Sequence, residues 1–164
     1  MDVPMTGSRE ASEVDALQEL GDEIATLAAH VYAVTHRLLV MIVEFDRRRG
    51  WEIDGHRSCA HWLAFRTGID LGAAREKVRA ARALERLPLV SAAMARGELS
   101  LAKVRSLTRV ADEQSESELL DFARTNTAAQ LERVVRGYRR DTRPDEAESE
   151  RIRHRLRTLS GLSG

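Results

Sequence analysis

An uninterrupted heptad repeat between residues 17 and 45 constrains this 164-residue chain more than any other feature. Its apolar side chains alternate spacings of three and four residues: Leu17, Leu20, Ile24, Leu27, Val31, Val34, Leu38, Met41 and Phe45. That spacing places all nine on one stripe of an α-helix. The sequence therefore predicts a single long helix over residues 12–48, with the repeat spanning about 42 Å at ~1.5 Å per residue.

The repeat leaves the partner of this stripe open between two alternatives. The stripe either packs on the rest of its own chain, or forms a coiled-coil homodimer through residues 17–45, and the spacing fits both. Four further apolar residues widen the stripe near its C-terminal end: Leu39, Val40, Ile42 and Val43. We expect that end to be buried on more than one side.

The rest of the chain predicts an all-α fold, because it is rich in strong helix formers and the whole sequence has only three prolines. We expect a long N-terminal heptad helix followed by a multi-helix bundle that contains a helix-turn-helix. The expected boundaries are a disordered lead-in at 1–11, one helical domain at 12–140 that ends in a bundle at 90–140, and a charged linker with a truncated tail at 141–164. Two capping boxes are predicted within the bundle, at Ser115 with Glu118 and at Thr127 with Gln130.

Residues 58–86 have the layout of a helix-turn-helix, two short helices joined by a tight turn. Ser58 and Asp70 are placed to cap the two helices, and Gly68 lies where the chain must turn sharply. The second helix carries small apolar residues on one side and arginines on the other, at i, i+4, i+7 and i+11: Arg75, Arg79, Arg82 and Arg86. Such a basic stripe is what a helix needs to lie between rows of DNA phosphates.

Charge is divided unevenly along a chain whose formal net charge is zero. Residues 1–46 hold two basic and nine acidic side chains, whereas residues 56–109 hold eleven basic and four acidic ones. The basic charge is therefore concentrated in and after the helix-turn-helix, which favours a polyanionic partner there.

Other classes of protein find little support in the sequence. The single cysteine, Cys59, excludes an internal disulfide, no signal peptide is evident, and the apolar run from Leu38 to Val43 is too short to span a bilayer. We therefore expect a cytoplasmic protein with no membrane partner. Cys59 and His61 form the only cluster with metal-ligand spacing and lack partner ligands, so we expect no metal and no cofactor.

The run from Gly55 to Val110 resembles the 13E12 repeat family, the helical N-terminal domain of unknown function in many actinobacterial proteins similar to HNH endonucleases. The resemblance covers roughly residues 17–157 and rests on shared motifs: Asp54-Gly55, Ser58, Trp62-Leu63-Ala64, Thr67-Gly68, Val78-Arg79, Ala81-Arg82-Ala83-Leu84, Leu87-Pro88, Gly97-Glu98-Leu99-Ser100 and Val104. Members usually continue into an HNH nuclease motif with metal-binding histidines. The 164 residues contain no such motif, so we expect no enzymatic activity from them.

A weaker resemblance links the same region to the DNA-binding domain of ParB-type partition proteins. Those proteins place a helix-turn-helix before Leu-Pro, a short helix and Gly-x-Leu-Ser, as Leu87-Pro88 and Gly97 to Ser100 do here. This resemblance implies DNA binding by analogy of fold alone.

Together these observations predict a helical domain that binds double-stranded DNA, as a partial member of an HNH-endonuclease-associated family. The N-terminal end of the second helix would enter the major groove, with Gly72, Ala73, Arg75 and Glu76 approaching bases. Arg79 and Arg82 would contact the flanking phosphates. Three further basic residues would position the DNA backbone: Arg66, Lys103 and Arg105.

The alternative function is a protein-interaction or dimerisation module that acts through the heptad helix. In that case the arginines would pair with an acidic surface, for example the acidic N-terminal half of the same chain. The two functions make different structural predictions. If Arg75, Arg79 and Arg82 are buried against acidic residues of the long helix, they are not available to DNA.

Overall fold

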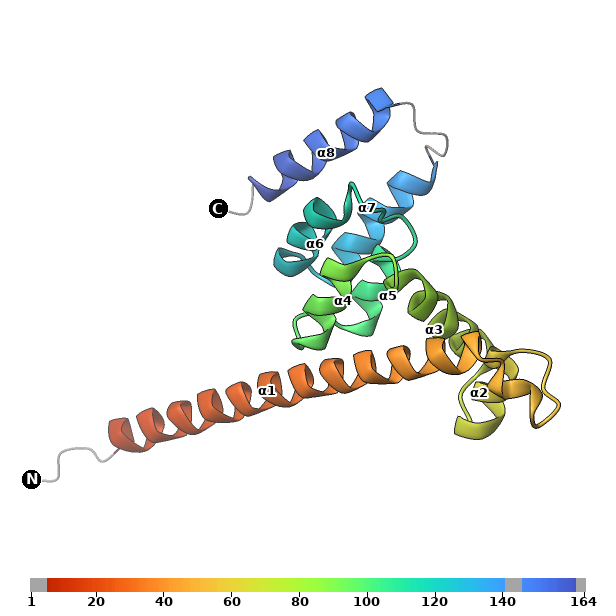
Figure 1. Cartoon of the computed structure of the whole chain (residues 1–164). Coiled ribbons are helices and arrows are strands. Elements are labelled where there is room, and N and C mark those ends of the chain that lie inside the picture. The colour runs from red at the N-terminus through yellow and green to blue at the C-terminus, as the bar shows by residue number, and fades with distance from the viewer. Residues whose placement is uncertain (1–5, 141–145, 162–164) are drawn as a thin grey trace, which may run out of the picture.

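The computed structural model describes residues 6–140 and 146–161, and within them it contains eight α-helices, one short 3-10 helix and no strand (Figure 1). The predicted all-α class is therefore confirmed. The elements in chain order are α1 (Thr6–Arg47), η1 (Gly50–Glu52), α2 (Cys59–Thr67), α3 (Leu71–Leu84), α4 (Pro88–Ala95), α5 (Leu101–Leu107), α6 (Glu116–Thr125), α7 (Ala128–Arg140) and α8 (Glu146–Ser160).

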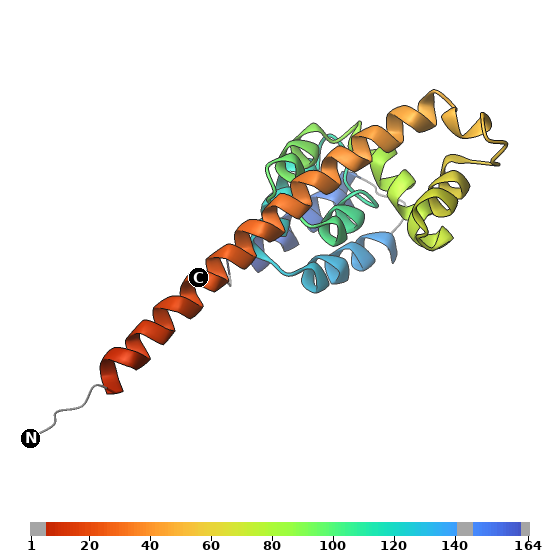
Figure 2. The ribbon, with the colours of Figure 1, turned by 90° about the horizontal axis from the view of Figure 1, so that it is seen from below.

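The long helix α1 contains 42 residues and projects far beyond the bundle at its N-terminal end (Figures 1 and 2). It begins at Thr6, so residues 6–11 are helical and differ from the disordered lead-in expected for 1–11; residues 1–5 lie outside the described part. Every side chain from residue 6 to residue 27 is exposed. Packing against the bundle therefore does not stabilise the projecting half of α1.

The C-terminal half of α1 packs on the bundle with a face that lies beside the heptad stripe, and the last heptad residue, Phe45, packs there too. Leu39, Ile42 and Val43 are buried there, and Phe45 stacks at a ring-centroid distance of 4.1 Å from Trp62 of α2. The heptad side chains from Leu17 to Met41 stay 40–67% exposed. The expectation that this end is buried on more than one side is not met, because the described residues cover only the inner face.

Helix α1 is also the one element in the described ranges whose length and composition would let it cross a membrane. Core helices of soluble proteins pass the same test, and part of the inner face of α1 is packed against protein. The absence of a membrane partner stays a prediction.

The predicted pair of helices between residues 58 and 86 is confirmed. The Ser58 hydroxyl accepts a hydrogen bond from the His61 N–H (3.2 Å), and the Asp70 carboxylate accepts one from the Gly72 N–H (2.9 Å). Gly68 ends α2 in the left-handed region with φ of 75°, a conformation that side chains other than glycine rarely adopt. Ser58 therefore fixes the start of α2, and Gly68 and Asp70 fix where α2 ends and α3 begins.

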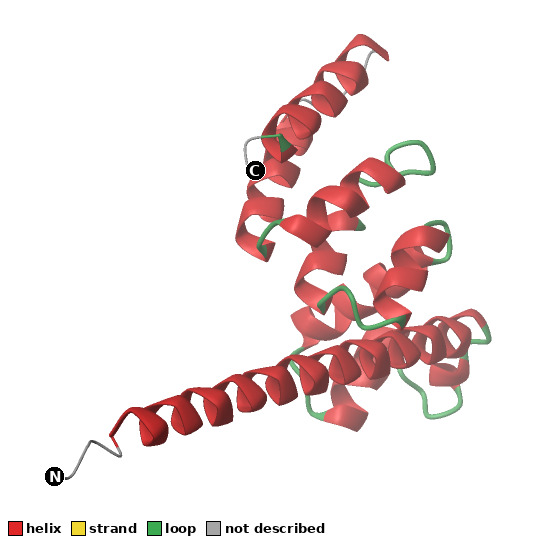
Figure 3. Cartoon of the chain, turned by 90° about the vertical axis from the view of Figure 1, so that its left-hand side faces the viewer, coloured by secondary structure: helices red, strands yellow, loops and turns green. Residues whose placement is uncertain are grey.

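The remaining helices form the compact part of the molecule, in which short loops join neighbouring helices (Figure 3). Pro88 occupies the first turn of α4, and the buried carboxylate of Glu116 accepts a hydrogen bond from the Val90 N–H (2.9 Å) at the same helix end. An anion at a helix N-terminus satisfies free N–H groups and the helix dipole. This contact ties α4 to α6.

One of the two predicted capping boxes is confirmed. Thr127 and Gln130 exchange both hydrogen bonds between side chain and backbone, at 3.2 and 2.8 Å. The predicted box of Ser115 with Glu118 is wrong: the Ser115 hydroxyl accepts from the Asp112 N–H instead. The Asp112 carboxylate in turn accepts a hydrogen bond from the Ser115 N–H. Asp112, in the turn before α6, therefore takes the place of Glu118 as the partner of Ser115 at the start of this helix.

The C-terminal segment differs from the truncated tail expected for residues 141–164. Residues 146–160 form α8, which packs beside α6 and buries Leu156. The linker segment 141–145 lies outside the described residues. The sequence pattern did not reveal this helix because few apolar side chains mark it: among the side chains described in α8, Leu156 is buried in the core and Ile152 packs against it.

Candidate nucleic-acid interface

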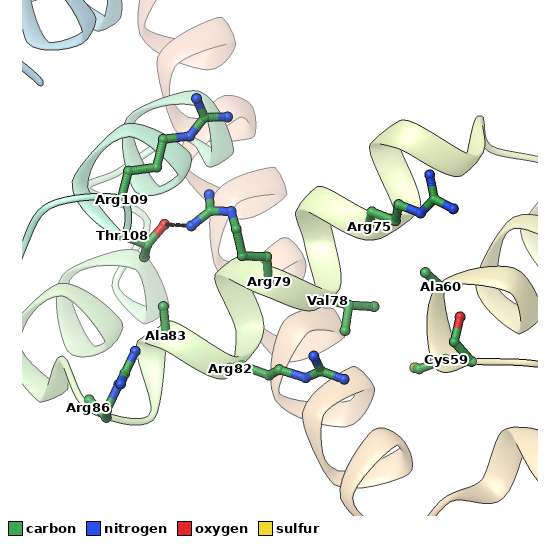
Figure 4. A pocket seen from close by; sticks show the side chains of 11 residues that line it. Cys59, Ala60, Arg75, Val78, Arg79, Arg82, Ala83, Arg86, Thr108 and Arg109 are labelled. Atoms are coloured by element: carbon green, nitrogen blue, oxygen red, sulfur yellow. Dashed lines mark hydrogen bonds between the residues drawn. The ribbon is translucent and has the colours of Figure 1, made fainter. Parts of the chain in front are cut away.

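An open groove of about 670 Å³ lies along α3, between α2 and the turn that follows α5 (Figure 4). Five arginines line it: Arg75, Arg79, Arg82, Arg86 and Arg109. The other lining side chains are small or uncharged: Ser58, Cys59, Ala60, Val78, Ala83 and Thr108. We call this surface the arginine groove.

The composition of α3 explains why its arginines share one side. Ala74, Val78 and Ala81 are buried, and their small side chains let α3 pack closely against α1 and α2. A helix whose apolar residues all face inward turns the intervening positions outward. Four arginines thus lie in sequence along one side of the helix, as Figure 4 shows.

Glu76 is the centre of an ion-pair cluster at one edge of the groove. Its carboxylate accepts hydrogen bonds from the guanidinium groups of Arg79 (3.1 Å), Arg105 (3.1 Å) and Arg109 (2.8 Å). The hydrogen bond from Arg79, with those from Arg109 and Arg105, outweighs burial and lowers the pKa of Glu76 to about 2. One ionised carboxylate therefore holds three arginines, from α3, α5 and the turn after α5, and the cluster keeps an excess of positive charge.

Arg79 also fixes the position of α3 relative to α5. Its guanidinium donates to the Thr108 hydroxyl (3.3 Å, Figure 4) and to the backbone carbonyl of Arg105 (3.1 Å). With Glu76 these contacts hold the Arg79 side chain in one orientation. Arg79 is consequently both a lining residue of the groove and a structural link.

Among the described residues, the acidic side chains of α1 form an ion pair with only one arginine of the stripe. Arg82 pairs with Asp46 of α1 at 2.7 Å, and its side chain stays 61% exposed. Glu85, which follows α3, pairs with Arg47 of α1 rather than with the stripe. Arg75 and Arg86 are exposed and make no ion pair with any residue that the structure describes. The three arginines used as the structural criterion are therefore not buried against the long helix.

The other predicted site residues fall into two groups. Gly72 and Ala73 are exposed in the first turn of α3, and Arg66 is exposed in the last turn of α2, 6.0 Å from the centre of the Trp62 ring. Lys103 is drawn away instead, because its ammonium donates to the Ala123 carbonyl at the end of α6 (2.6 Å). Arg105 reaches the groove only through Glu76.

Two of the lining arginines, Arg86 and Arg109, were absent from the predicted site. Arg86 continues the stripe at i+11, so the helical period of the sequence contains the signal for it. Arg109 lies 33 residues from Glu76 along the chain and meets it only when α5 packs on α3. No local pattern marks that contact.

The cysteine and histidine beside the groove have structural partners. Cys59 is 1% exposed, and burial raises the pKa of its thiol to about 11. The Nδ1 atom of His61 lies 2.8 Å from the Ser58 hydroxyl. Among the described residues, no three of His, Cys, Asp or Glu gather in a way that could hold a metal ion.

Comparison with known proteins places this arrangement in a family. The family model for DUF222, a domain of unknown function, matches residues 14–156. This family is typically found in actinobacterial proteins associated with HNH endonucleases. No curated protein and no solved structure matches the chain at a significant level. The match spans α1 to α8 and includes both the heptad stripe and the arginine groove, so the chain belongs to the DUF222 family.

Proposed function

We propose that the chain binds double-stranded DNA through the arginine groove, as a member of the 13E12 repeat family within DUF222. The observation that carries this proposal is a single open groove lined by five arginines, two of which have no carboxylate partner among the described residues. Two carboxylates, Glu76 and Asp46, pair with the remaining lining arginines. The surface therefore keeps the positive charge that a phosphate backbone attracts.

The shape of the site supports a helix in the major groove of DNA. The first turn of α3 is exposed at Gly72 and Ala73, so two small residues lie where a base edge would approach. Arg75 lies one turn further along the same helix, and Arg82 and Arg86 follow beyond it. In this arrangement Arg75 reaches a base or its phosphate, and Arg82 and Arg86 contact the backbone further along.

The ion pairs of Glu76 favour a different role for this residue. Its carboxylate is engaged by three arginines, so we propose that it holds Arg79, Arg105 and Arg109 together and offsets part of their charge instead of contacting a base. The proposed role of the groove is binding rather than catalysis.

A pair of matched variants tests the proposal by fluorescence anisotropy with a labelled 20-base-pair duplex. The double substitution Arg75→Ala/Arg86→Ala removes the two unpaired arginines without breaking an ion pair. The control Arg133→Ala/Arg155→Ala removes the same charge from α7 and α8, where both side chains are exposed. We expect the first variant to lose at least tenfold in affinity and the control to lose less than twofold. Equal losses in both variants, or no binding by the unsubstituted chain at low salt, would refute the proposal.

We propose a second role for the long helix, as an interaction surface independent of DNA. The observation that favours it is the exposed heptad stripe on α1, which the rest of the described chain leaves uncovered. A continuous apolar stripe of this length is uncommon on the surface of a monomer. Sedimentation equilibrium at concentrations from 1 to 100 μM tests whether the chain associates, and a mass of 18.4 kDa at every concentration would exclude self-association.

A further inference from the structure

The outer face of α1 carries eight heptad side chains from Leu17 to Met41, each exposed by 40–67%, on the side of the helix that turns away from the bundle. We propose that this face is the interface between two copies of the chain arranged as an antiparallel coiled coil. The inference rests on the second role proposed above, that of α1 as an interaction surface. It does not depend on DNA binding.

The spacing of the heptad side chains gives a complete register for two helices that run in opposite directions. In that register each apolar residue of one copy meets an apolar residue of the other, and the two-fold axis passes near Ala29. The four layers, each formed twice by symmetry, are Leu17 with Met41, Leu20 with Leu38, Ile24 with Val34, and Leu27 with Val31. No polar residue enters any of these layers.

The charges on α1 decide between the two directions. Six carboxylates and one arginine lie between residues 6 and 23: Glu10, Glu13, Asp15, Glu19, Asp22, Glu23 and Arg9. A parallel pair would bring two such acidic halves together, and like charges repel across a helix pair. The antiparallel register places this half beside the more basic C-terminal half of the other copy. It also sets Glu23 opposite Arg37 at a flanking position of the seam.

The area available matches what a specific dimer needs. Burying the exposed part of one large aliphatic side chain removes on the order of 100 Å² from water, so eight of them supply on the order of 800 Å² from each copy. Specific complexes bury about 800 Å² per partner. The paired segment runs from Leu17 to Met41, about 36 Å at ~1.5 Å per residue.

Sedimentation equilibrium on the full chain tests the interface. Leu20→Glu lies on the projecting half of α1, where no side chain touches the bundle, so it cannot unfold the domain. We expect it to raise the dissociation constant of the dimer at least a hundredfold, whereas Gln18→Glu, on another face of the same turn, changes it less than threefold. A dimer that tolerates Leu20→Glu as well as Gln18→Glu would overturn the assigned face.

Spin labels test the direction of the partner helix. Labels are attached at Glu10→Cys in one sample and at Gln18→Cys in another; the unsubstituted chain is the labelling control, since Cys59 is only 1% exposed. In the antiparallel register the distance between the two copies of a label changes by about 3 Å per residue, giving about 57 Å for residue 10 and about 33 Å for residue 18. A parallel dimer gives the same short distance, below about 20 Å, at both positions.

A charge exchange provides a second test of direction. Glu23→Arg places an arginine opposite Arg37 of the other copy, and the two-fold axis forms this contact twice. We expect the affinity of the dimer to fall about fivefold. Adding Arg37→Glu to the same chain restores the opposite charges and the affinity. Restoration fails if the helices are parallel, because Glu23 and Arg37 then lie about 21 Å apart along the axis.

The outcomes separate the inference from the proposal on which it rests. A monomer at all concentrations refutes both the interaction role of α1 and the antiparallel dimer. A dimer whose labels lie at equal short distances keeps the interaction role and overturns the orientation. Flotation of the chain with vesicles of phosphatidylcholine and phosphatidylglycerol, with loss of flotation in Leu20→Glu, would show that a lipid surface covers the stripe and would overturn the dimer.

Discussion

The substitution Glu76→Gln separates the structural role of Glu76 from a direct role in reading DNA. The carboxylate has a pKa of about 2 in the folded chain, against 4.5 for an unperturbed glutamate. A depressed folded pKa contributes stability that is fully present above the unfolded value and is lost as pH falls through the folded value. The Glu76 side chain is 26% exposed, so solvent weakens this contribution only in part.

The shift of Glu76 corresponds to about 3 kcal/mol of stabilisation at pH 7, of which about 1 kcal/mol remains at pH 3. We expect Glu76→Gln to lower the free energy of unfolding by 2 to 3 kcal/mol at pH 7, and by about 1 kcal/mol at pH 3. Urea denaturation followed by tryptophan fluorescence measures both values, since the chain has two tryptophans. The control is Glu113→Gln, which removes an exposed carboxylate and should leave the stability unchanged at both pH values.

The same variant should bind DNA more tightly, although it is less stable, if Glu76 restrains and partly neutralises three arginines. Removing the carboxylate releases Arg79, Arg105 and Arg109 to phosphates, so we expect tighter duplex binding and a steeper dependence on salt. The reasoning is refuted if the stability loss is the same at pH 7 and pH 3. A variant that keeps its stability and loses DNA affinity would instead support the contact with a base that the sequence predicts.

Three further predictions concern the fold. Leu39→Ala should lower the free energy of unfolding by 2 to 5 kcal/mol, because Leu39 is 1% exposed. Leu27 is 64% exposed, so Leu27→Ala should change this free energy by less than about 0.5 kcal/mol. Urea denaturation of dilute protein compares the two variants. Gly97→Ala should lower the melting temperature by several degrees, since Gly97 has φ of 80° and a Cβ there would lie 2.5 Å from a backbone oxygen of α1. A Cβ at Gly137, within α7, meets nothing within 4 Å, so Gly137→Ala should raise the melting temperature. The Cys59 thiol, buried and with a pKa of about 11, should react with Ellman's reagent in urea and not in the native chain at pH 7.5.

Local signals in the sequence predicted the helices well because caps and turns depend on neighbouring residues. Ser58, Gly68 and Asp70 set the ends of α2 and α3 where the sequence placed them. The helix start at Thr6 and the helix α8 were missed for related reasons. The first turns of α1 consist of small and polar residues with exposed side chains, and α8 is highly charged with few buried side chains described. Ser115 illustrates a further limit, since the residue that bonds to its hydroxyl precedes the helix.

The sequence predicted the positions of the arginines in the candidate site but not their ion pairs. The helical period of the sequence contains the stripe from Arg75 to Arg86, but it cannot show which arginines are neutralised. The pairing of Arg82 with Asp46 depends on how α1 packs on α3, and that of Arg109 with Glu76 on how α5 does. Lys103 was expected at the DNA backbone by its position on a helix, but tertiary packing brings its ammonium to the end of α6. Charge counting therefore located the basic region, whereas the structure identifies its unpaired members.

The measurement that tests the central claim most directly is the salt dependence of duplex binding by the unsubstituted chain. Each phosphate neutralised by an arginine releases about 0.9 of a counterion, so a groove lined by five arginines should give a slope of about −3 to −5 in a plot of the logarithm of affinity against the logarithm of salt concentration. The plot is built from anisotropy titrations between 50 and 200 mM salt. Arg75→Ala/Arg86→Ala should reduce the slope by about 2. A slope near zero, or one that the double substitution leaves unchanged, would contradict the assignment of the arginine groove to DNA.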